Sequence, residues 1–189
     1  MSTVISPTPM TTEEMLALPE NGADRELIRG QLREKPMTRR NRRHSRTESR
    51  IVTILEIWLG PQPEPRGEVV SGEAGFRLSR DPDSTVGIDV AYVSAEVAAR
   101  EPDAAYFEGP PVLAVEILSP SDTLEDIDEK VELYLEMGVA IVWVVHPRFR
   151  TVTVYRPGAD PVMFSGTQEL TAEPHLPGFC VSVDRLFGF

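Results

Sequence analysis

The chain has 189 residues with a single cysteine and a net charge of −11; 41% of its residues are hydrophobic and 26% charged. These values are typical of one globular domain with a full core. Because Cys180 has no partner, an internal disulfide framework and a multi-cysteine zinc site are excluded. No apolar run reaches the roughly 18 residues of a membrane span, and the N-terminus lacks a signal peptide. We therefore expect a cytoplasmic protein with a flexible terminus at 1–10 and a single domain at 11–189.

The charge is distributed unevenly along the chain. Residues 25–50 contain ten Lys and Arg but only three acidic residues, which gives this segment a charge of about +7. The acidic total argues against a protein that coats nucleic acid, whereas a local basic segment can contact phosphates. The candidate phosphate contacts are Arg39, Arg40, Arg42, Arg43 and Arg46.

The first third of the chain predicts a helix, a hairpin and a second helix. Thr11 and Glu14 have capping-box spacing, which predicts a short helix over 12–18. Alternating residues on both sides of Arg29 and Gly30 predict a β-hairpin. Apolar residues at helical spacing follow the arginine-rich segment, and Gly60 ends this second helix. They are Ile51, Leu55 and Trp58.

The rest of the chain alternates predicted strands with one clear helix. We expect a bulged strand over 67–79, a strand that starts near Asp89, and a surface loop over 95–109. The apolar segments 110–119 and 140–145 are typical of strands buried on both faces. The acid-rich segment between them predicts a helix, with Asp122 and Glu125 as its capping pair, and hence a parallel crossover. A strand over 150–157, shorter strands and a small helix over 183–187 complete the chain.

One glutamate stands inside the first of these buried strands. An unpaired buried carboxylate costs several kcal/mol, so Glu116 requires either a basic partner or a cation. Asp89 lies on the preceding predicted strand, and the two carboxylates converge if the strands are neighbours. Two carboxylates, water and the backbone carbonyl of Ile117 would suit a hard divalent ion such as Mg²⁺.

Lys130 is the basic residue best placed to complete such a site. It lies on the flank of the predicted helix, from where its ammonium can reach the strand ends. Each of these residues also has an ordinary interpretation. Glu116 would then form a structural ion pair, Asp89 would cap a turn, and Lys130 would be a solvated helix lysine.

Several segments in combination carry a family resemblance: RELIRGQL, GFRLSRDPDS, GIDVAYVS, PPVLAVEILSPSD, EKVELYLEMGVAIVWVVHP and TVTVYRPG. They resemble the Uma-two family of endonucleases, in the PD-(D/E)XK, restriction-endonuclease-like superfamily, from about Thr11 to Phe187. The resemblance implies an α/β fold, in which helices flank a mixed β-sheet preceded by an N-terminal helix and hairpin. It also implies cleavage of nucleic-acid phosphodiester bonds, foremost those of DNA, with Mg²⁺ or Mn²⁺.

The same resemblance assigns site residues. It matches the superfamily aspartate to Asp89 and the second acidic residue to Glu116. A standard enzyme has lysine two residues later, where this chain has Leu118, and family members supply the lysine from the next helix, which matches Lys130. His44 stands where the family tends to have histidine and is an auxiliary candidate.

Two other functions remain open at this stage. One is a non-catalytic module that keeps the nuclease fold to bind a protein or nucleic acid partner, and the other is metal-dependent hydrolysis of a smaller phosphate ester. A homodimer is expected for an enzyme that cuts both strands of a duplex.

Overall fold

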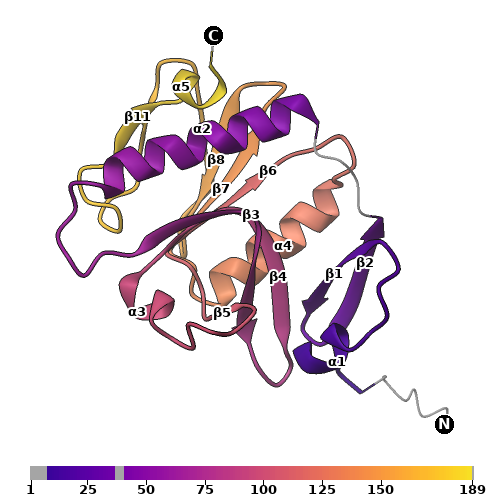
Figure 1. The fold of residues 1–189 in the computed structure, drawn as a ribbon. Helices are drawn as coiled ribbons and strands as arrows, with labels where there is room; N and C mark the ends of the chain where they lie inside the picture. Colours follow the sequence, from indigo (N-terminus) through magenta and orange to yellow (C-terminus); the bar gives the residue numbers. More distant parts are fainter. Residues whose placement is uncertain (1–7, 37–40, 189) are drawn as a thin grey trace.

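A large mixed β-sheet organises the molecule (Figure 1). The computed structural model describes residues 8–36 and 41–188. Seven strands follow one another in the order β2-β1-β4-β6-β7-β8-β9, while β3 pairs with β4 and with β5, and β10 and β11 form a separate pair. The strands are β1 (Ala23–Ile28), β2 (Gln31–Pro36), β3 (Glu68–Ser79), β4 (Ser84–Val93), β5 (Phe107–Glu108), β6 (Leu113–Ile117), β7 (Ile141–His146), β8 (Thr151–Tyr155), β9 (Val162–Ser165), β10 (Glu169–Thr171) and β11 (Cys180–Ser182).

Helices cover both faces of this sheet (Figure 1). They are α1 (Thr12–Leu16), α2 (Arg42–Leu59), α3 (Ala95–Ala98), α4 (Leu124–Glu136) and α5 (Asp184–Phe187). The mixed sheet flanked by helices confirms the predicted fold class.

The central strands β6 and β7 are parallel, with Val115 opposite Trp143, and α4 connects them. Their alternating side chains enter two separate cores. Val115 and Trp143 pack in one core with residues of α2, whereas Ala114 and Val142 pack in the other with residues of α4. Since Glu116 follows the alternation of Ala114, its side chain points to the α4 side.

The two long helices begin at clear caps. Asn41 accepts hydrogen bonds from the backbone N–H groups of Arg43 and His44, which starts α2. The cap of α4 is Thr123, whose hydroxyl accepts from Asp126 N, and not the predicted pair of Asp122 and Glu125. Asp122 instead accepts from Ser119 N in the preceding turn.

The β1–β2 hairpin turns at Arg29 and Gly30, which both have positive φ, as the sequence predicts. One ladder pair, Leu27 and Thr85, joins the hairpin to β4, and Glu26 adds a hydrogen bond from Gly87 N. Ion pairs attach its outer side chains to α4. They join Arg29 to Glu136, Arg33 to Glu129 and Lys35 to Asp126, at 2.7, 2.8 and 3.1 Å.

Two further sequence expectations are corrected. Residues 95–109 are not a plain loop, because they contain α3 and β5. Asp89 does not open a strand but lies in the middle of β4, which begins at Ser84 and pairs with β3 along most of its length. The predicted bulge in β3 is confirmed, and it displaces Glu73, which has a positive φ of 60°.

The packing of α2 gives a stability prediction. Leu55→Ala should lower the free energy of unfolding by about 2–5 kcal/mol, because the side chain is fully buried between α2 and the sheet. Ile57→Ala on the same helix, where the side chain is 70% exposed, should change it by less than about 0.5 kcal/mol. Urea unfolding measures both, and equal effects would contradict this packing.

Candidate functional site

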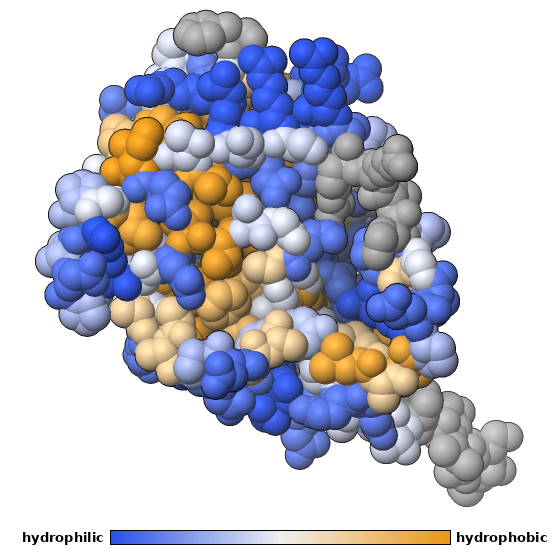
Figure 2. Space-filling model, viewed as in Figure 1, coloured by the Kyte–Doolittle hydropathy of each residue, from blue (hydrophilic) through white to orange (hydrophobic). Residues whose placement is uncertain are grey.

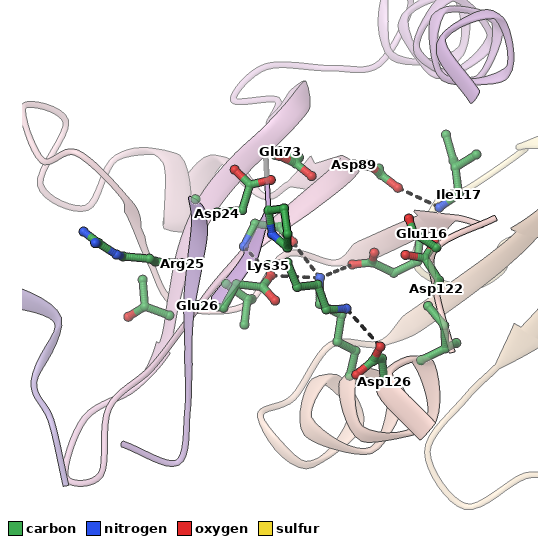
Figure 3. A pocket seen from close by; sticks show the side chains of 18 of the residues that line it. Asp24, Arg25, Glu26, Lys35, Glu73, Asp89, Glu116, Ile117, Asp122 and Asp126 are labelled. Carbon is green, nitrogen blue, oxygen red and sulfur yellow. Dashed lines mark hydrogen bonds and ion pairs between the residues drawn. The ribbon is translucent and has the colours of Figure 1, made fainter. Parts of the chain in front are cut away.

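A cleft of about 630 Å³ opens between the β1–β2 hairpin, β4, β6 and α4 (Figure 3). Acidic side chains dominate its lining, and Lys35 and Lys130 reach into it from opposite walls. The acidic residues are Asp24, Glu26, Glu73, Asp89, Glu116, Asp122 and Asp126. A cleft of this charge favours a cation before it can accept an anionic ligand.

Asp89 and Glu116 lie side by side at the inner end of the cleft. The antiparallel register of β4 and β6 ends with Val90 opposite Val115, and Asp89 and Glu116 are the next residues along the two strands. Both line the cleft, and the charge of Asp89 adds to the rise in the pKa of Glu116. Both side chains are nearly buried, with exposed fractions of 5% and 7%. The predicted convergence of the two carboxylates is therefore present.

Asp89 is held by partners on both sides. Its Oδ2 accepts a hydrogen bond of 2.7 Å from the backbone N–H of Ile117, as Figure 3 shows, and lies 3.2 Å from His44 Nε2. A lone histidine is usually a surface residue, but His44 is fully buried. Its position beside Asp89 connects the first turns of α2 to the cleft.

Glu116 has one oxygen that is strongly engaged. Tyr134 donates its hydroxyl hydrogen to Oε1 at 2.6 Å, and the Lys130 ammonium lies 3.6 Å from the same atom. Burial raises the pKa of Glu116 to about 7; Lys130 and the Tyr134 hydrogen bond oppose this rise, whereas Asp89 adds to it. In the described part of the chain, no hydrogen bond to Oε2 is found, which leaves that oxygen available for a cation.

Lys130 is a fixed cation. Its Nζ lies 2.8 Å from Glu26 Oε1 and donates to the carbonyl oxygen of Gly87 at 3.2 Å. Burial by itself would lower the pKa of Lys130, but Glu116, Tyr134 and Glu26 together hold it well above its usual value. A raised pKa favours the protonated ammonium, so Lys130 suits the role of a fixed positive charge better than that of a general base.

Sequence reasoning missed Glu26, Tyr134 and Glu73. Glu26 comes from β1 and also accepts from Gly87 N at 3.1 Å, so it links the hairpin, β4 and α4. Tyr134 follows Lys130 by four residues on α4, and this spacing was a usable signal. No local signal identifies Glu26, because its partners are 61 and 104 residues away.

The predicted arginine contacts do not line this cleft. Arg42, Arg43 and Arg46 are exposed on the first turns of α2, and Arg46 borders a different hollow. Arg39 and Arg40 fall outside the described residues.

The donor set fits a hard divalent ion with few protein ligands. Among the described residues, no group of three or more His, Cys, Asp and Glu side chains is arranged as a metal site. Mg²⁺ usually keeps several waters and binds through one or two carboxylates, which Asp89 and Glu116 would supply. A cation there would also offset the cost of burying two neighbouring carboxylates.

Comparison with known proteins agrees with the resemblance seen in the sequence. A family model named Uma2 and described as "Putative restriction endonuclease" matches residues 12–184. The chain belongs to the Uma2 family.

A solved structure shares its fold. It is the crystal structure, at 1.96 Å resolution, of "a putative nuclease belonging to DUF820 from Anabaena variabilis ATCC 29413". The TM-score is 0.79 and the identity 24%, over 95% of this chain and 98% of the other. Among curated proteins, no similar sequence was found. None of the described helices has the length and apolar character needed to cross a membrane.

The buried position of Glu116 gives a prediction for the metal-free protein of this Uma2 member. Its pKa of about 7 lies above the ordinary 4.5, so the folded protein keeps a proton that the unfolded chain releases between those values. Stability of the wild type should therefore fall as pH rises through this window. Glu116→Gln removes the titration, so its stability relative to the wild type should increase as pH rises from 5 to 8, by a total on the order of 3 kcal/mol.

Urea unfolding in EDTA at several pH values measures this difference. Glu125→Gln, an exposed acid of α4, is the matched control and should follow the wild type. Parallel stability curves for Glu116→Gln and the wild type would contradict the burial of a strained carboxylate.

Proposed function

We propose that this Uma2 protein is a divalent-metal-dependent endonuclease that hydrolyses phosphodiester bonds, with DNA as its substrate. The observation that carries the proposal is the pair of Asp89 and Glu116 on neighbouring strands, with Lys130 beside them. Membership of the Uma2 family supports the reaction class. We further propose that the enzyme acts in the cytoplasm as a homodimer, because cleavage of a duplex requires two cuts.

Asp89, Glu116 and the backbone carbonyl of Ile117 would hold Mg²⁺ or Mn²⁺. The ion would lower the pKa of water and stabilise negative charge on the phosphoryl group. The Ile117 N–H and His44 fix the rotamer of Asp89. Tyr134 fixes Glu116 through Oε1, which directs Oε2 away from α4.

Lys130 supplies the second positive charge of the site. Since its raised pKa favours the protonated ammonium, its role is to stabilise the charge that develops on the phosphate in the transition state. Glu26 and the Gly87 carbonyl hold the ammonium in place before substrate arrives, so no reorganisation is required. Exposed Arg42, Arg43 and Arg46, together with Arg39 and Arg40 before them, would contact backbone phosphates outside the cleft.

The first test is cleavage of plasmid DNA, single-stranded DNA and RNA with and without Mg²⁺ or Mn²⁺. Wild type should cleave DNA only with metal, and Asp89→Asn or Glu116→Gln should reduce the rate by at least about 100-fold. Asp103→Asn, an exposed acid outside the cleft, is the control. Equal cleavage by all four proteins would reject the assigned site.

Titration calorimetry separates an inactive enzyme from a binding module. Wild type should bind Mg²⁺ or Mn²⁺, and both site variants should lose this binding. If wild type neither binds a divalent ion nor cleaves any phosphodiester, including a small phosphate ester, the chain is a non-catalytic module that binds a partner.

A second test concerns Glu26 as a positioning residue. Glu26→Gln should lower kcat by about 10–100-fold, as is typical for residues that orient a site, and leave KM for DNA nearly unchanged.

Glu34→Gln is the matched control on the same hairpin, because Glu34 pairs with Arg25 and lies on the exposed side. A purely structural role for Glu26 would lower stability and leave kcat of the folded protein unchanged. That result would contradict the assignment.

A further inference from the structure

A second hollow, of about 430 Å³, lies on the outer face of α2 against α5. Three arginines from the two helices border it: Arg46, Arg50 and Arg185. The remaining lining consists of small polar and apolar side chains of α2, namely Ser49, Thr53, Ile54 and Ile57. Figure 2 shows hydrophilic side chains along this edge of the molecule, and Figure 1 shows α2 and α5 beneath them.

These arginines differ from most others in the chain. In the part of the chain that the structure describes, none of the three has a carboxylate within salt-bridge distance. The arginines that do have acidic partners are Arg25, Arg29, Arg33, Arg66, Arg77, Arg80, Arg100 and Arg150. The chain has 30 acidic and 19 basic residues and is therefore acidic overall. A hollow bordered by three arginines without acidic partners among the described residues is a locally positive region on this acidic protein.

The nearest acid on α5 is already engaged. Asp184 pairs with Arg150 at 3.3 Å, and the Arg50 guanidinium packs where a side chain at Gly188 would stand. Among residues 8–36 and 41–188, no carboxylate forms an ion pair with the three arginines of the hollow. An anionic ligand would supply the negative charge that the described residues do not place beside these arginines.

The hollow and the site share helix α2. His44 contacts Asp89 from the inner face of this helix, whereas Arg46 and Arg50 border the hollow on its outer face. Arg50 is about 9 Å further along the helix axis than His44. The opposite wall of the cleft is formed by α4, whose exposed acids repel phosphates. A nucleic acid that reaches the cleft would consequently extend over α2 and away from α4.

We infer that the hollow bordered by Arg46, Arg50 and Arg185, here called the α2–α5 groove, binds the phosphate backbone of nucleic acid outside the cleft. The inference rests on the proposed nuclease function, since it extends the same substrate beyond the cleavage site. Arginine guanidinium groups suit this ligand, because they bind phosphate oxygens through two parallel hydrogen bonds.

The test measures binding of a labelled 24-base-pair DNA duplex by fluorescence anisotropy in EDTA, over a series of salt concentrations. Arg50→Gln/Arg185→Gln should weaken binding and lower the slope of log K against log salt by about 1.8, because each lost phosphate contact removes about 0.9. The affinity for a trinucleotide, which can occupy only the cleft, should fall much less.

Arg80→Gln/Arg100→Gln is the matched control. It removes the same charge on the side of α3 and β5, far from α2 in Figure 1, and should keep the wild-type slope. Three outcomes would overturn the inference: no binding of the duplex by wild type, an unchanged slope in the groove variant, or an equal fall in the control variant.

Sedimentation of the same proteins tests the competing occupant, a second copy of the chain. A wild-type dimer that Arg50→Gln/Arg185→Gln converts to monomer would make the groove a subunit interface and overturn the inference. Cleavage is measured separately with metal, so duplex binding that depends on the groove but yields no cleavage would reject the nuclease and keep the groove.

Discussion

The burial of Glu116 next to Asp89 is the constraint on which the rest of the site depends. Two carboxylates in the middle of a sheet would be costly without compensation, and three groups from two elements compensate them. Lys130 and Tyr134 come from α4, and the Ile117 N–H comes from β6 itself. The position of α4 against the sheet is therefore tied to the charge of the site as well as to the apolar core.

The same constraint explains why the N-terminal hairpin is part of the site. The Lys130 ammonium contacts Glu116 of β6 and Glu26 of β1, and β1 belongs to the hairpin. The hairpin shares one ladder pair and two side-chain hydrogen bonds with β4, and its ion pairs to α4 close the cleft on the other side. Exposed ion pairs are individually weak, so the buried pair of Lys130 and Glu26 is the firmest of these connections.

Charge is also separated across the molecule. The acids of α4 face the cations of the hairpin, whereas the outer face of α2 carries arginines that no described acid neutralises. The net charge of −11 is a sum over the whole chain, so it does not show how charge is distributed over the surface that a ligand meets. An acidic protein can accordingly present one basic edge suited to phosphates.

By itself, the sequence determined the order of the main elements and the pair of Asp89 and Glu116, because buried strands and a charged helix leave strong local patterns. It also indicated Lys130, through its place on the flank of α4 and through the family resemblance. Only the tertiary structure decided that Glu26 completes the site and that His44 is buried against Asp89. It also showed that Asp89 lies in the middle of β4 and that Arg46 and Arg50 of α2 border a separate groove. The physical reason is that these contacts join residues far apart in the chain, through the docking of a hairpin and a helix that no local periodicity encodes.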